Sequence, residues 1–549
     1  MTSLAYLPRD VLIEIFSYFC PHCRGDLKPI KGVGTPHQQK RWREPQQPDQ
    51  KSWYSIDKNI LFSLATSCKT LHAAAEDILY HDFAPGYGDS ELSELYTYGN
   101  RLNHVMSTVG RRKDLADKVR VLFVHPKHSN ASVKRIVLAL KQGADALGID
   151  IAKAWRHRAE HFVKTWTRET TLGEDEYVFM LNSAFTDEIL EYAVLRNGPP
   201  YDSMRSGTAS QVARNFRLTA NRFYRTLHHE LIPMLIALLP KLSHIIYKHK
   251  SVFEEESVFD MFEHTALDAL GVTELPYLRA LEIDKDIFSI LKRAPNLEQL
   301  DITKSSFPQR DQGSFGNRSK ITTLRLQDTS STSELSKALS FAAKDLRSLV
   351  VESSLRSSTP WVIPAGVIKH VRDYRHSLET LHLDFRDARV NSRSRSSDCT
   401  FQDFEKLQYV FLNTRLMFQI PPDLYSITQL LPPSLVSLHL AWNGLQLDPT
   451  ERALQLRLAE ESLDRSGNLH FAARALQVRE VAESLIRQRE LSLLERALLE
   501  LANGKAERFQ DLKHIGLDCW DKVDAAVHEA MLEAGIEFVP ESWPVAYQK

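Results

Sequence analysis

Residues 278–302 read LRALEIDKDIFSILKRAPNLEQLDI, and they contain the pattern L-x-x-L-x-[LI] twice. The first copy is Leu278, Leu281 and Ile283, and the second copy starts at Leu297. Within a copy the second and third aliphatic residues are two positions apart, so both point to the same face of a β-strand. One strand cannot bury that face alone, whereas stacked neighbours can, and the stretch therefore predicts a repeat architecture.

The same pattern returns along most of the chain. Copies with three aliphatic residues start at residues 278, 297, 321, 346, 378, 407, 435 and 512, and weaker copies start at 119 and 242. The first seven starts lie 19 to 32 residues apart, close to the roughly 20–29 residues of one strand and one return segment. The segment Glu334–Ala343 is expected to be a helical return. An ordinary α/β sheet with leucine-rich strands is the alternative, but so many copies in one linear array favour stacked repeats.

The amino terminus predicts a separate set of helices. Residues 7–16 read LPRDVLIEIF, in which Pro8 suits the first helical turn and Asp10 complements the positive end of the helix dipole. A second helix, with Asp57 as its expected N-cap, is indicated by apolar residues at helical spacing. These residues are Leu61, Leu64, Cys68 and Leu71. A third short helix is expected over residues 73–80.

These residues resemble the F-box family. The family pattern is a leading Leu-Pro, an acidic residue, an Ile/Leu-rich helix that ends in Phe, and then a Leu-x-x-Val/Ala-x-x-x-Cys-Lys helix. The resemblance implies docking on a Skp-type adaptor and, through it, on a cullin of a ubiquitin ligase. Carried over by position, the adaptor surface would include Leu7, Pro8, Val11, Leu12, Ile15 and Phe16. Leu61, Leu64 and Leu71 would be divided between that surface and the domain's own core.

The resemblance has one departure, because residues 20–57 separate the first two helices where the family has only a few residues. Such a loop costs little by closure entropy, although it could obstruct the adaptor. It contains Cys20-Pro-His-Cys23, which resembles half of a zinc site. His22 or His37 could add ligands, but no second Cys-x-x-Cys exists in the chain. We therefore expect a loop with free thiols, and no metal or other cofactor.

Composition limits the binding partners and the cellular compartment that we expect for the protein. The chain has 69 Lys and Arg against 70 Asp and Glu, which gives no general attraction to nucleic acid or to anionic membranes. The first ten residues lack the basic and apolar regions of a secretory signal, and the apolar stretch 231–239 is too short to cross a bilayer. The five cysteines then indicate a reduced intracellular protein of the cytoplasm or nucleus, without a disulfide framework.

Two segments interrupt the repeats. Residues 450–510 contain Leu491, Leu494, Leu498 and Leu501 at helical spacing. We expect this helical insertion to pack on the flank of the repeats rather than to form a partner-binding arm, because the heptad pattern does not persist. Residues 387–400, rich in Ser and Arg, are expected to form a surface loop.

The sequence thus predicts an α/β protein. Residues 1–83 would form a three-helix F-box domain with an insertion at 20–57, and residues 84–277 a helical region with degenerate repeats. Residues 278–549 would form an irregular leucine-rich-repeat solenoid, with parallel strands on its concave face and helices on its convex face. Both parts resemble the F-box proteins with leucine-rich repeats found in filamentous fungi.

The expected function follows from the resemblance. No Gly-rich phosphate loop, HExxH helix or nucleophile elbow is present in the sequence, so we expect no enzyme. We expect a substrate-recognition subunit whose concave face, from Asp284 to Trp442, binds a target protein. The first alternative is a repeat scaffold without a role in ubiquitin transfer, in which the amino-terminal helices only cap the solenoid. A GTPase-activating repeat protein ranks last, because no Arg singles itself out for that role.

Overall fold

The structure is a computed structural model, and it describes a defined part of the 549 residues. The described residues are 4–24, 53–85, 101–124, 133–151, 153–154, 230–247, 266–283, 288–303, 320–327, 332–352, 364–384, 400–413, 427–441, 488, 491–517 and 522–539. The chain divides into two compact units, Met1–Glu298 and Gln299–Lys549, which we call the amino-terminal and carboxy-terminal units.

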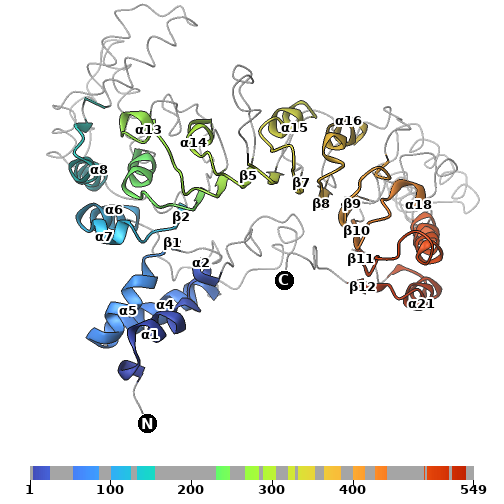
Figure 1. Cartoon of the computed structure of the whole chain (residues 1–549), viewed down its shortest axis with the longest axis horizontal. Coiled ribbons are helices and arrows are strands. Elements are labelled where there is room, and N and C mark those ends of the chain that lie inside the picture. Colours follow the sequence, from blue (N-terminus) through green and yellow to red (C-terminus); the bar gives the residue numbers. More distant parts are fainter. Residues whose placement is uncertain are drawn as a thin grey trace, which may run out of the picture. The chain divides into compact units, whose positions relative to one another are not determined.

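The amino-terminal unit begins with a helical module, drawn in dark blue in Figure 1. The module consists of α1 (Arg9–Ser17), α4 (Trp53–Ser67) and α5 (Lys69–Leu79). A 3-10 turn (Leu4–Tyr6) precedes α1, and the one-turn helix α2 (Pro21–Arg24) follows it. The three predicted helices are therefore present.

Two details of the module correct the sequence prediction. The apolar stripe through Cys68 is not one helix, because Cys68 has an extended backbone (φ −159°, ψ 164°) that separates α4 from α5. Asp57 is not an N-cap, because α4 begins earlier, at Trp53. The Asp57 carboxylate instead accepts a hydrogen bond of 3.1 Å from Arg24, so this ion pair joins the two described ends of the insertion.

A parallel sheet follows the module in the amino-terminal unit. Its strands are β1 (Asp82–Phe83), β2 (Val121–Val124), β3 (His244–Tyr247) and β4 (Ala280–Ile283). Each strand pairs with the next in chain order. The helices of this part are α6 (Arg101–Arg111), α7 (Lys113–Ala116), α8 (Val133–Leu147), α13 (Ala266–Ala269) and α14 (Phe288–Arg293).

The carboxy-terminal unit repeats the same plan. Its strands are β5 (Gln299–Thr303), β6 (Thr323–Gln327), β7 (Ser348–Glu352), β8 (Thr380–Asp384), β9 (Tyr409–Asn413), β10 (Ser437–Ala441), β11 (His514–Leu517) and β12 (Glu537–Val539). The strands pair in parallel and in chain order. The connecting helices include α15 (Thr332–Leu339), α16 (Pro364–Val371), η3 (Arg372–Tyr374), α18 (Ile427–Leu430) and α21 (Ala525–Glu533). Figure 1 shows α15 and α16 on one side of the strands of this unit.

The repeat prediction is confirmed at the level of strands and burial. Each of the ten copies contains a strand of a parallel sheet, and all three of its pattern residues are buried. The described residues hold two further strands, β1 and β12, that the pattern did not predict. Both are shorter than the other strands, and neither carries the full three-residue pattern.

The predicted helical returns are confirmed in part. Within Glu334–Ala343, α15 ends at Leu339, and its Leu335 is buried. Residues 491–504 are helical, and Leu494, Leu498 and Leu501 are fully buried. That burial agrees with a helix packed on the unit rather than a free arm.

The buried pattern residues should carry most of the stability of each unit. Leu381 in β8 is fully buried, so we expect Leu381→Ala to lower the free energy of unfolding by about 2–5 kcal/mol through lost burial and a residual cavity. The check is urea unfolding of the full chain followed by circular dichroism. The exposed Lys344→Ala is the control, and equal midpoints for the two variants would contradict a core role for Leu381.

Candidate functional site

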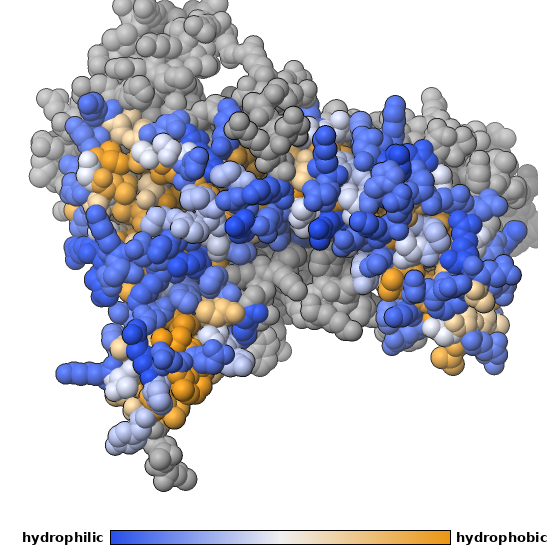
Figure 2. All heavy atoms as spheres, viewed as in Figure 1, coloured by the Kyte–Doolittle hydropathy of each residue, from blue (hydrophilic) through white to orange (hydrophobic). Residues whose placement is uncertain are grey.

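One face of α1 carries apolar side chains that reach the solvent. Leu7, Val11 and Tyr18 are exposed by 37%, 43% and 63%, and Ile15 is half-buried. Val11 and Ile15 are four residues apart and share one side of α1, whereas Leu7 lies just before the helix and Tyr18 just after it. Helix α4 adds further exposed apolar residues: Ile56, Ile60 and Phe62. Figure 2 shows hydrophobic residues gathered on the visible surface of the helical module. Such a patch on a small module is typical of a protein-docking surface.

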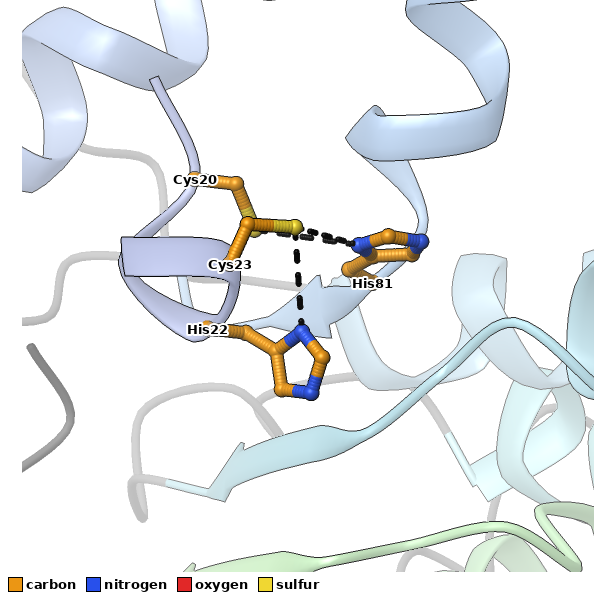
Figure 3. Close-up of side chains that lie close together, drawn as sticks. All are labelled: Cys20, His22, Cys23 and His81. Atoms are coloured by element: carbon orange, nitrogen blue, oxygen red, sulfur yellow. Dashed lines mark hydrogen bonds between the residues drawn. The ribbon is translucent and has the colours of Figure 1, made fainter. Parts of the chain in front are cut away.

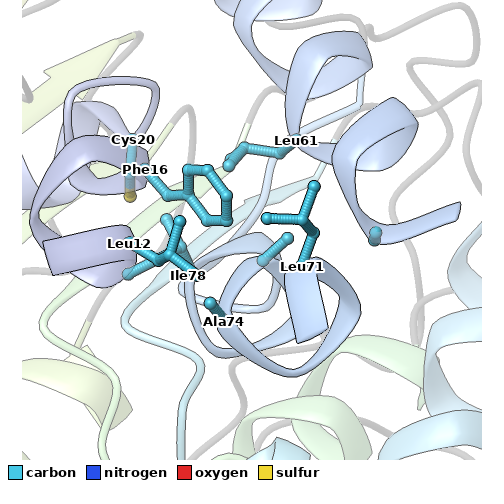
Figure 4. Close-up of a cluster of buried hydrophobic side chains, with 9 residues drawn as sticks. Leu12, Phe16, Cys20, Leu61, Leu71, Ala74 and Ile78 are labelled. Carbon is cyan, nitrogen blue, oxygen red and sulfur yellow. The ribbon is translucent and has the colours of Figure 1, made fainter. Parts of the chain in front are cut away.

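An adjacent face of α1 forms part of the core of the module. Leu12 and Phe16 are fully buried against side chains of α4 and α5 (Figure 4). The remaining buried members of this cluster are Cys20, Leu61, Ala65, Leu71, Ala74, Ala75 and Ile78. Leu12 and Phe16, expected on the adaptor surface, are therefore core residues, and Leu61 and Leu71, expected either on that surface or in the core, also lie in the core. Leu7, Pro8 and Val11 are exposed, and Ile15 and Leu64 are half-buried.

Ion pairs join the module to the segment that follows it. Asp77 on α5 accepts hydrogen bonds from Arg9 and from Lys118. Burial by itself would raise the pKa of Asp77, but the two cations outweigh it and hold that pKa below its usual value. Arg112 reaches Glu76 at 3.4 Å in the same way. The junction is therefore largely polar, whereas the interior of the module is apolar.

A cluster of cysteine and histidine side chains lies where the module meets β1. Cys20 directly precedes α2, His22 and Cys23 lie in α2, and His81 immediately precedes β1 (Figure 3). The Sγ of Cys23 lies 3.1 Å from Nδ1 of His81 and 3.9 Å from Nδ1 of His22. The Sγ of Cys20 lies 3.9 Å from Nδ1 of His81. One nitrogen or sulfur atom of each residue lies within 4.8 Å of the corresponding atoms of the other three.

The two thiols of this cluster differ in their surroundings. The hydrogen bond with Cys23 and burial raise the pKa of Cys20 to about 11, whereas the same bond lowers the pKa of Cys23. Asp82 contributes a buried carboxylate 3.9 Å from the Sγ of Cys20, and Lys58 forms an ion pair with it. The site thus combines one buried and one accessible sulfur with balanced charges beside them.

Sequence reasoning did not find His81 as a member of this group. Cys20-Pro-His-Cys23 resembles half of a zinc site, and His37, a possible further ligand by sequence, lies outside the described residues. His81 is far from the motif in sequence, and its only local signal is its position directly before Asp82 and Phe83. The packing of α1 against α5 brings His81 close to the motif, and a short sequence motif cannot predict such a tertiary contact.

In the carboxy-terminal unit the strand residues between the buried aliphatics form lateral rows. One row follows the register Asp301, Arg325, Val350, His382, Phe411, His439 and Gly516. Arg325 reaches Asp301 at 3.4 Å and Glu352 at 3.0 Å, so it joins three neighbouring strands. These polar residues were expected on an open concave face. They are buried instead, and Arg325 contacts two carboxyl groups among them, whereas Oε1 of Glu352 is buried without a hydrogen-bond partner among the described residues.

Three rings of the same row stack on one another. The ring centroids of His382 and Phe411 are 3.9 Å apart, those of Phe411 and His439 are 4.7 Å apart, and both interplanar angles are 9°. The stack ends at Gly516, where an added Cβ would lie 2.2 Å from Nδ1 of His439. Glycine is therefore required at this strand position to leave room for the ring.

The two residues proposed to contact a target, Asp284 and Trp442, lie outside the described residues, as do residues 387–399. No family model matches the chain, and no curated protein matches it. In the part of the chain that the structure describes, none of the helices has the length and apolar character needed to span a bilayer.

The ring stack gives a prediction about Gly516. We expect Gly516→Ala to lower the free energy of unfolding by about 1–3 kcal/mol, because the new methyl group must displace the His439 ring from its place beside Phe411. Thermal unfolding of the full chain tests this. Gly504→Ala is the matched control, since its Cβ would keep at least 3.4 Å from its neighbours, and an equal effect of both changes would contradict the close-approach argument.

The ion-pair network gives a prediction about pH. Burial raises the pKa of Glu352 from 4.5 to about 7; Arg325 opposes the rise, and Asp384 and Asp301 add to it. His382 also faces Glu352, at 3.7 Å. Because the pKa is higher in the folded chain, folding is favoured below the unfolded pKa and this contribution is lost as the pH rises through about 7.

We therefore expect Glu352→Gln to reduce the loss of stability between about pH 5 and about pH 8. The measurement is the urea midpoint of the carboxy-terminal transition at several pH values. Asp345→Asn, at an exposed position of the same unit, should leave the pH dependence unchanged. If the urea midpoint of Glu352→Gln depends on pH as strongly as that of the wild type, Glu352 is not held neutral in the fold.

Proposed function

We propose that the chain is the substrate-recognition subunit of a cullin-type ubiquitin ligase. In this proposal the helical module is an F-box that docks on a Skp-type adaptor, and the parallel-strand repeats are leucine-rich repeats that bind the target protein. The proposal implies an intracellular protein. The single observation that carries it is the exposed apolar surface along and beside α1, where Leu7, Val11 and Tyr18 reach the solvent although the module has a core of its own.

The distribution of apolar residues supports docking over simple capping. A helix that only capped the repeats would bury its apolar side against the first strand. Here Leu12 and Phe16 are buried among residues of α4 and α5, whereas Val121 and Phe123 of β2 belong to a different cluster with Ala84 and Ile246. The second apolar face of α1 is thus left for a partner, and the links to the next segment are mainly ion pairs.

The proposed role requires no bond chemistry from the chain itself. A receptor that binds an adaptor with one part and a target with another raises the effective concentration of the target beside the ligase's catalytic subunits. The rows of polar residues on the strands are buried, so target contacts are expected in the segments after the strands. Asp284 and Trp442 directly follow β4 and β10 in the sequence and remain the proposed contacts.

The alternative function is a repeat scaffold that binds partners without ubiquitin transfer. It shares the repeats and the target site with the main proposal but gives no reason for an exposed apolar face on α1. The two proposals therefore differ in one measurable property, which is binding to a Skp-type adaptor.

The docking surface can be tested with exposed positions alone. We expect Leu7→Asp/Val11→Asp to weaken binding to a Skp-type adaptor by more than about tenfold, because two charges would enter an apolar interface. The melting temperature should stay near that of the wild type, since both side chains are exposed. Isothermal titration of the purified full chain with the adaptor measures the effect.

Leu138→Asp on α8 is the matched control, because Leu138 is 54% exposed but lies outside the module. It should leave adaptor binding unchanged. Absence of binding by the wild-type chain, under conditions in which a known F-box protein binds, would favour the scaffold.

A further inference from the structure

We propose that Cys20, His22, Cys23 and His81 bind one zinc ion, which fastens the helical module to the start of the first parallel strand. This inference goes beyond the proposed function, and its tests do not depend on adaptor binding. The argument rests on the donor set, on the distances between the donor atoms, and on how the backbone holds both halves of the site.

The donor set suits zinc. Two cysteine sulfurs and two histidine nitrogens are the ligands of a common class of structural zinc sites, which are four-coordinate and tetrahedral. Sulfur and nitrogen donors in a tetrahedral arrangement favour zinc over the cations that prefer oxygen ligands. Two thiolates would also neutralise the double charge of the ion, so the complete site would be uncharged. A neutral site suits a position in which Cys20 lies in an apolar core.

The distances fit a single ion. Ligand bonds of about 2.0–2.3 Å in a tetrahedron place the donor atoms about 3.3–3.8 Å from one another. The observed separations of 3.1 Å, 3.9 Å and 3.9 Å bracket this range. All four donor atoms lie within 4.8 Å of one another, so small side-chain rotations would complete the tetrahedron. Figure 3 shows the side chains from both segments pointing toward one another.

The backbone holds each half of the site in place. On one side, the Arg24 N–H donates to the Cys20 carbonyl at 3.1 Å, which closes the single turn of α2 and keeps both cysteines on one side of it. On the other side, the His81 carbonyl accepts from the N–H groups of Arg120 and Val121 at 2.7 Å and 3.1 Å. His81 is therefore fixed to the beginning of β2.

The position of the site suggests its role. Cys20 is part of the module's core, and His81 directly precedes β1 and is bonded to β2. An ion held by both would restrain the module against the first strands at a junction otherwise made by ion pairs. Cys23 is exposed, and His22 and His81 are half-buried, so an ion can reach the site from solvent. No ligand position would remain for substrate, which indicates a structural rather than a catalytic ion.

The first test is the metal content of the full chain. The chain should be purified under reducing conditions with a histidine-free affinity tag and without chelators. We expect about one equivalent of zinc per chain by inductively coupled plasma mass spectrometry. Cys23→Ser and His81→Asn should lose this zinc while keeping the circular dichroism spectrum of the folded chain. Cys23 and His81 are chosen because Cys20 lies in the core, where a substitution could unfold the module.

Matched controls separate the site from other thiols and imidazoles. Cys68→Ser changes an exposed cysteine of the same module, and His104→Asn changes an exposed histidine on α6, and both should retain the zinc. Removal of zinc with a chelator should lower the wild-type melting temperature and make the link between the module and β1 more sensitive to protease. It should have little further effect on Cys23→Ser.

Cobalt gives a second, independent readout. Replacement of zinc by Co²⁺ should give the visible absorption of a tetrahedral complex and a sulfur-to-cobalt charge-transfer band, which should weaken in Cys23→Ser. A wild-type chain that binds neither zinc nor tetrahedral cobalt would overturn the proposal. So would a non-reduced chain in which Cys20 and Cys23 are joined by a disulfide, or zinc that persists in both ligand variants.

Discussion

The backbone ladder between successive strands is the interaction on which the rest of the fold depends. Ahead of several strands one carbonyl accepts from two N–H groups of the next copy, as when the Arg347 carbonyl accepts from Glu379 at 2.8 Å and from Thr380 at 3.0 Å. The Glu379 carbonyl repeats this with Gln408 and Tyr409. Equivalent positions hold Arg347, Glu379, Gln408 and Val436, whose side chains have little in common. The ladder therefore fixes the register through the main chain and leaves the intervening side chains free to vary.

The sequence predicted the structure correctly wherever the spacing of apolar residues alone determines which side chains are buried. The pattern residues placed ten strands, and each lies in the parallel sheets with its aliphatic residues buried. On α1 the same reasoning was insufficient, because the helix has two apolar faces. Periodicity shows that Leu12 and Phe16 share one face and that Val11 and Ile15 share another. It does not show which face meets α4 and α5.

Contacts between residues that are distant in the sequence could not be predicted, for a different reason. His81 reaches Cys23 only because two helices pack together, and the network around Arg325 depends on three neighbouring strands. No local pattern encodes either group. Long-range packing also pairs some buried polar residues of the strands, as when Arg325 contacts Asp301 and Glu352 on the two neighbouring strands. Ion pairs thus occur in both the module and the repeats, and the module adds a cysteine–histidine cluster.

The short terminal strands β1 and β12 have a consequence for how the protein behaves at high concentration. An unpaired strand edge is a template on which another chain can add, and long flat edges lead to aggregates and filaments. Among the described residues, the first strand of the amino-terminal unit, Asp82–Phe83, and the last strand of the carboxy-terminal unit, Glu537–Val539, each offer only a brief run of main-chain groups. Repetition of one strand motif would otherwise invite chain-to-chain growth, and each of these short strands offers little main chain for it.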